Sequence, residues 1–187
     1  MKFIKLLALV LSFQCFAQSQ ELHLSQNVVL DVPLSKTILH TGNILIFKFG
    51  DSHISHEVLS PKEFFSPIDL TGVEKEFVRS LFEFTENSSF PQWLNAASNE
   101  LSETLGITKD NKVIEVKGGL EILGFYDSES QSGQLFILDT SLIHHFTFLG
   151  SDELFKNLYQ SIREKIMSLT IEEKRNLKTF WISLYGP

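Results

Sequence analysis

Apolar residues recur at two different spacings along the chain, and the two spacings predict an α+β protein. Short runs rich in β-branched and aromatic residues predict strands over 27–32, 37–40, 44–49, 112–117, 120–126, 134–138 and 142–149. Apolar residues three or four apart predict helices over 71–82, 91–106, 152–166 and 170–184. Strands, two helices, more strands and two further helices are typical of a single α+β domain. We expect a mainly antiparallel sheet of about six strands packed with helices.

Turn residues refine this prediction at two places and weaken it at a third. Gly42-Asn43 and Gly118-Gly119 each separate two strand-like runs, which indicates two β-hairpins. The segment 51–67 contains Pro61 and Pro67, so we expect a loop there, or one short helical turn.

The first seventeen residues have the pattern of a cleaved secretory signal. Lys2 and Lys5 precede the apolar run 6–13, and the segment ends on the small residue Ala17. The run is about half as long as a bilayer-spanning helix requires, so we expect no transmembrane anchor in the mature chain. The sequence therefore predicts a signal peptide over 1–17 and one exported α+β domain over 18–187, located in the periplasm or outside the cell.

Cysteine content and charge narrow the setting further. Cys15 is the only cysteine and lies inside the predicted signal, so the mature domain has none. Small extracellular domains of animals usually contain disulfides, and their absence favours a bacterial exported protein. The formal charge is −7, and no cluster of lysine or arginine follows the signal. Because affinity for nucleic acid comes largely from neutralised phosphates, this composition argues against a nucleic-acid partner.

One local cluster has the residue types of a metal site. Imidazole and carboxylate groups are zinc ligands, and a zinc site in this chain would use His53, His56, Glu57 and His145, with His144 as a substitute for His145. The order departs from zinc-protease motifs, because Ser60 stands where the second histidine is needed. On a helical turn His53 and His56 would be neighbours, whereas on a strand they would lie on opposite faces. An exposed polar loop without a metal explains the same residues.

Other signatures of catalysis or cofactor binding do not occur. The chain has no nucleophile-elbow, phosphate-binding or dinucleotide-binding motif, and we expect no cofactor apart from zinc under the metal interpretation. Phenylalanine is abundant, with 17 residues. Most match inward helical positions and predict core packing, but Phe84, Phe90 and Trp93 fall beside the helical stripes. They are the candidates for an apolar groove that binds a ligand or a partner.

These observations favour an exported, non-enzymatic accessory protein. It would bind an apolar small molecule, a peptide or an envelope protein. Two alternatives stay open: a metal-dependent hydrolase built on His53, His56 and Glu57, and an inhibitor or immunity protein that acts outside the cytoplasm.

Overall fold

The computed structural model describes residues 19–35, 37–66, 68–83 and 89–165. Within these ranges ten strands and three helices form one α+β domain, which confirms the expected fold class. The predicted signal 1–17, the candidate residue Phe84 and the predicted closing helix 170–184 lie outside the described residues.

The main sheet has seven antiparallel strands, where about six were expected. In spatial order they are β3 (Thr37–Thr41), β4 (Ile44–Phe49), β5 (Ser52–Val58), β9 (Ile143–Leu149), β8 (Ser132–Leu138), β7 (Leu120–Asp127) and β6 (Lys112–Lys117). Both predicted hairpins, β3–β4 and β6–β7, are present.

This strand order divides the sheet into two meanders. β3, β4 and β5 follow one another in sequence and in space, and so do β6, β7, β8 and β9. The two groups meet only where β5 pairs with β9, in a register that runs from His53 opposite Leu149 to Val58 opposite His144. We call this contact the β5–β9 junction. It brings together the two ends of the segment 59–142, whose described residues include two helices and the strands β6, β7 and β8.

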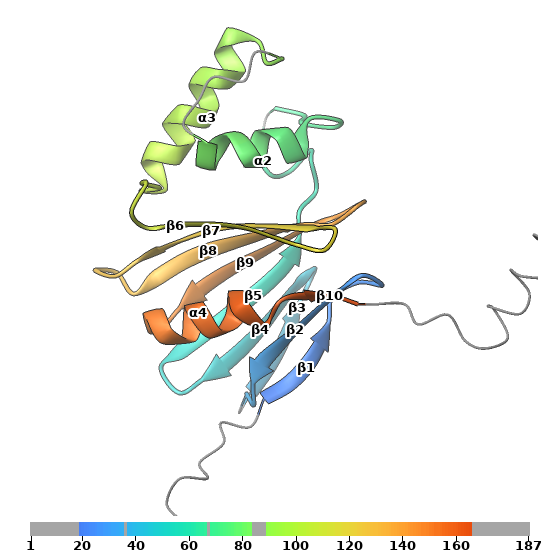
Figure 1. Ribbon diagram of the computed structural model, residues 1–187, viewed down its shortest axis with the longest axis vertical. Coiled ribbons are helices and arrows are strands. Elements are labelled where there is room, and N and C mark those ends of the chain that lie inside the picture. Colours follow the sequence, from blue (N-terminus) through green and yellow to red (C-terminus); the bar gives the residue numbers. More distant parts are fainter. Residues whose placement is uncertain (1–18, 36, 67, 84–88, 166–187) are drawn as a thin grey trace, which may run out of the picture.

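Each face of the main sheet is covered by a different layer (Figure 1). Below it, in that view, lie the small sheet and one helix: β1 (Ser19–His23), β2 (Val28–Pro33), β10 (Arg163–Glu164) and α4 (Asp152–Ser161). Above it lie α2 (Glu74–Glu83) and α3 (Gln92–Thr104). We call these two sides the lower and the upper face.

Each face therefore has its own apolar core. The lower core joins Phe47, Ile54, Phe146 and Phe148 of the sheet to Val28, Leu30, Phe155 and Leu158 of the covering layer. The upper core joins Phe136 and Leu123 to the predicted inner face of α2, which includes Phe77, Val78, Leu81 and Phe82. All four of these α2 residues are fully buried, as the helical periodicity predicted.

The interpretation of 51–67 as loop or helical turn is wrong for its first half, because Ser52–Val58 forms β5. This strand is paired on both sides, with β4 and with β9. Its mixed sequence, Ser-His-Ile-Ser-His-Glu-Val, lacks the usual strand composition, and only the two partner ladders stabilise it as a strand. The strand propensity of these seven residues does not reveal that β4 and β9 will pair with them.

The helix predicted from residue 71 begins three residues later, at Glu74. The Thr71 hydroxyl donates to the Asp69 carboxylate at 2.6 Å, while the Glu74 carboxylate accepts from the Gly72 amide. The Asp69 carboxylate also accepts from the Thr71 amide, so Thr71 is bonded within the turn that precedes the helix.

Candidate functional site

The strand conformation of β5 decides where the candidate metal ligands lie. Alternate residues of a strand point to opposite faces. His56 lies on the lower face, in the row of Leu45 and Phe146, whereas His53 and Glu57 lie on the upper face. The structure thus places three of the four candidates, His53, Glu57 and His145, on the far side of the sheet from His56. Within the described residues, no group of three histidine, cysteine, aspartate or glutamate side chains is placed to hold a metal ion.

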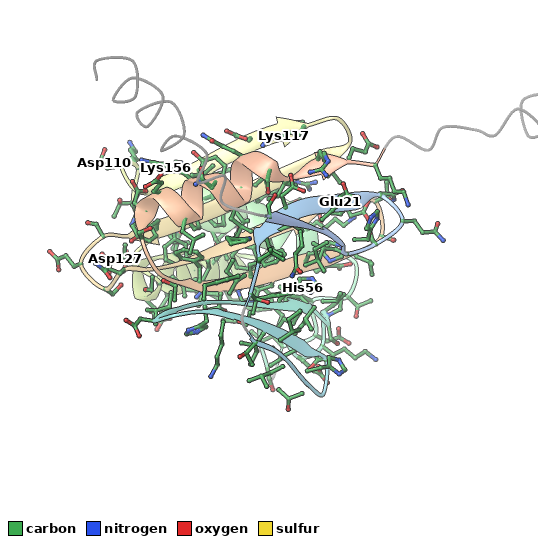
Figure 2. The ribbon with its side chains drawn as sticks, turned by 90° about the horizontal axis from the view of Figure 1, so that it is seen from below. Glu21, His56, Asp110, Lys117, Asp127 and Lys156 are labelled. Carbon is green, nitrogen blue, oxygen red and sulfur yellow. The ribbon has the colours of Figure 1, made fainter. Side chains whose placement is uncertain are left out.

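On the lower face His56 forms a buried pair with His144 across the β5–β9 junction. Nε2 of His56 lies 3.1 Å from Nδ1 of His144, and the two rings are 5.3 Å apart. His144 is fully buried and His56 is 9% exposed. The His56 ring also lies 4.8 Å from the ring of Phe146. Figure 2 shows His56 within the body of the protein, on the side of β4 and β5.

The pair is built to be neutral. One ring nitrogen must donate to the other, and Nε2 of His144 is buried without a hydrogen-bond partner among the described residues. A bare acceptor there costs less than an unpaired N–H, so we assign the donor to Nδ1 of His144. Burial, together with smaller contributions from His144 and His145 in the same direction, lowers the pKa of His56 to about 4. Burial also lowers the pKa of His144, against the opposing charge of Asp139.

On the upper face His145 makes a second contact across the same junction. Its Nδ1 lies 3.0 Å from Glu57 Oε1, and its Nε2 lies 3.2 Å from Gln134 Oε1. The ring stacks on Phe136 at 4.7 Å with an interplanar angle of 17°. Burial lowers the pKa of His145, although the hydrogen bond and charge of Glu57 act in the opposite direction. Both ring nitrogens face acceptor oxygens, and a neutral ring donates a hydrogen bond to only one of them.

A small cavity opens beside this contact. Its volume is about 290 Å³, and it is lined by Asn43, Glu57, Val58, Leu59, Ser60, Glu63, Phe64 and His145. His145 lines this cavity, and its two ring nitrogens already contact Glu57 and Gln134. The metal-dependent hydrolase stays a prediction from the sequence, and the geometry of the described residues gives it no ligand set.

The aromatic candidates separate in a similar way. Phe90 is 8% exposed and belongs to the upper core, while Trp93 is 55% exposed on the first turn of α3. Between the helices and the sheet, aromatic rings pack on one another: Phe64 contacts Phe77 and Phe136. Phe82 contacts Phe136 as well. In the described residues this space is therefore core, and Trp93 is the candidate that faces solvent.

A third feature is the position of β3 at the edge of the main sheet. The sequence predicted this strand but not its edge position. All five of its residues are exposed, including Ile38 at 53% and Leu39 at 43%. Leu34, just before the strand, is 50% exposed. The strand contains no formally charged residue and no proline. Its two consecutive apolar residues were a possible signal, but only the strand order shows that β3 lies at an edge.

Comparisons with known proteins found no match to this chain. No family model, no curated protein and no solved structure matches it. Among the described residues, none of the helices has the length and apolar character needed to span a bilayer.

Proposed function

We propose that this chain is an exported, non-enzymatic accessory protein that binds an extended segment of an envelope protein along β3. The single observation behind the proposal is an exposed, uncharged edge strand with apolar side chains on both of its faces. The signal-like pattern of residues 1–17 supports the exported setting.

The backbone of β3 supports strand addition. Its inner side is paired with β4 over five residue pairs, from Thr37 opposite Lys48 to Thr41 opposite Ile44. Its outer side has no partner strand among the described residues. An edge of this kind offers a row of N–H and C=O groups to an incoming strand, which is a known mode of peptide recognition.

The side chains of β3 indicate the kind of partner. Ile38 is in register with Phe47 of the lower core, and Leu39 is in register with Ile46 on the upper face. An added strand would place successive side chains beside Ile38 on one face and Leu39 on the other. The partner segment is therefore expected to have two or more consecutive apolar residues and no proline.

The other edge of the sheet shows the contrast. β6 also exposes apolar residues, Ile114 at 49% and Val116 at 71%. It contains Lys112, Glu115 and Lys117, however, and charges on an edge strand are a common protection against pairing. β3 has no such protection, so it is the edge suited to binding.

Site-specific crosslinking tests the proposal. A photocrosslinker would be attached through cysteine at Leu39→Cys, and at Val116→Cys as the matched control on the other edge. We expect position 39 alone to crosslink, repeatedly to one extended segment of one exported protein. A synthetic peptide of that segment should then bind with a dissociation constant that Leu39→Lys raises at least tenfold and Val116→Lys leaves unchanged. Equal crosslinking at both edges, no crosslinking at position 39, or binding that Leu39→Lys does not weaken would refute the proposal.

A further inference from the structure

The β5–β9 junction has an unusual composition for the centre of a sheet. Histidines contact the opposite strand on both faces at the same end of the ladder: His56 with His144 below, and Glu57 with His145 above. The residue pairs Glu57–His145 and Val58–His144 are adjacent in the register. The other lower-face residues of this junction are apolar: Ile54 lies opposite Phe148, Phe146 lies opposite His56, and Val58 lies opposite His144.

The junction is also the place where the sheet can divide without breaking a hairpin. β3–β4–β5 and β6–β9 are each built from sequence neighbours, whereas β5 and β9 are separated by the 84 residues between Val58 and Ile143. Opening the β5–β9 ladder would leave both meanders internally paired. It would free the meander that contains β3.

We propose that the β5–β9 junction is an acid-sensitive switch: protonation of the buried histidine pair His56–His144 opens it and releases the β3–β4–β5 meander before the rest of the domain unfolds. The consequence for partner binding rests on the proposed function of β3. The opening itself does not.

The electrostatics of the pair support this inference. A proton added to either ring gives a buried cation whose neighbour is another imidazole. In the part of the chain that the structure describes, Nε2 of His144 has no hydrogen-bond partner to share the charge. The other groups that act on the pair are His145 of β9 and Asp139 of the β8–β9 turn, and Glu57 acts on His145. On β3, His40 lies in the same cross-strand row as His56, through Leu45. Only Asp139 and Glu57 stabilise a protonated histidine here, and burial outweighs both.

The expected size of the effect follows from linkage. In the opened state His56 regains its ordinary pKa of 6.5, while in the closed state its pKa is about 4. The lower closed-state pKa means that acid favours the open state, from about pH 6.5 downward. Between pH 7 and pH 5 the opening equilibrium constant should rise by about 20-fold from His56 alone.

Hydrogen exchange on the full mature chain tests the switch without any partner. Amide protection factors would be measured at pH 7 and pH 5. We expect those of β5 and β9 at the junction to fall by about 20-fold, while those of β7, β8 and α2 stay constant. His56→Gln should reduce this difference, and His56→Gln combined with His144→Gln should abolish it. His53→Gln, on the same strand but on the upper face, is the matched control and should retain it.

Three results would overturn the proposal: junction protection that does not change with pH, protection lost equally throughout the domain, or a pH response that His56→Gln combined with His144→Gln leaves unchanged. If His56→Gln does not fold, NMR titration of the wild-type His56 ring decides, because a pKa near 6.5 in the closed state excludes the switch. Peptide binding to β3 at pH 7 is measured separately. Failure of that binding refutes the proposed function and leaves the exchange result to stand alone.

Discussion

Replacement of Asp139 tests how the β1–β2 loop is held against the main sheet. The Asp139 side chain is 4% exposed and follows β8 directly. Its carboxylate accepts hydrogen bonds from Ser25 Oγ at 3.1 Å, Asn27 Nδ2 at 3.1 Å and the Thr140 amide at 2.6 Å. Two of the three donors belong to the loop between β1 and β2, more than a hundred residues earlier in the chain. One carboxylate therefore connects the two sheets.

The magnitude follows from those three bonds. A hydrogen bond to a charged group contributes about 1.5–3 kcal/mol, and donors left without an acceptor in a buried site cost a similar amount. The Asn27 and Thr140 groups are partly exposed and can regain water, so we discount their share. We expect Asp139→Ala to lower the free energy of unfolding by about 3 kcal/mol. Asp139→Asn keeps one acceptor oxygen and should cost about 1 kcal/mol.

The assay is urea unfolding of the mature chain at pH 7, followed by circular dichroism. The midpoint should fall while the slope stays constant, which marks a loss of stability with no change in the surface exposed. Asp127→Ala is the matched control, because the Asp127 carboxylate accepts from the nearby Glu129 amide and the Ser130 hydroxyl, within one turn. A loss for Asp139→Ala no larger than for Asp127→Ala would refute this reasoning.

The same group predicts a pH dependence. Burial by itself raises the pKa of Asp139, but the hydrogen bonds from Thr140, Asn27 and Ser25 outweigh burial and lower it below 3.8. A lowered pKa means that this contribution is complete above pH 4 and is lost as the pH falls through the folded-state value. Wild-type stability should therefore fall more steeply below pH 4 than that of Asp139→Ala. The window lies below the one in which the buried histidines act, so the two effects can be measured separately.

Two further substitutions test the packing. Gly133→Ala should destabilise the domain by about 2 kcal/mol or more, because a Cβ there would lie 2.5 Å from the Phe125 carbonyl oxygen of β7, whose backbone cannot move aside. Thermal unfolding measures this loss of stability. A melting temperature equal to that of wild type would contradict the close approach. Lys117→Met should cost about 1 kcal/mol, because Lys117 Nζ donates to the Tyr159 and Gln160 carbonyl oxygens at the end of α4. Figure 2 shows Lys117 beside that end of the helix. Urea unfolding measures the loss, and a variant as stable as wild type would show that these carbonyl groups need no cation.

Local sequence patterns predicted the elements that are stabilised by residues close together in the chain. The α2 stripe repeats every three or four residues and is fully buried, so its period alone revealed a helix. Gly118 adopts a positive φ of 61° in the β6–β7 turn, a conformation that glycine tolerates best, so the hairpin was predicted as well. Both depend on contacts between residues close in sequence.

β5 and the histidine contacts depend on residues far apart in sequence. Ser52–Val58 has no strand period of its own, and its conformation comes from ladders with β4 and with β9. The residue types of a zinc site were visible at His53, His56 and Glu57, but the strand sends them to opposite faces. Which histidine meets which group was set by the register, since a shift of one residue would exchange the faces of every side chain.

The amino-acid sequence by itself determined the α+β class, the hairpins and the buried helix face, and it is the basis of the exported setting that we propose. Those features follow from local periodicity, turn residues and composition. Only the tertiary structure decided that β3 lies at an open edge and that two histidine contacts join the meanders at the β5–β9 junction. The physical reason is that strand order and register are set by packing between residues far apart in the chain. The residues of one strand do not specify which other strands will pair with it.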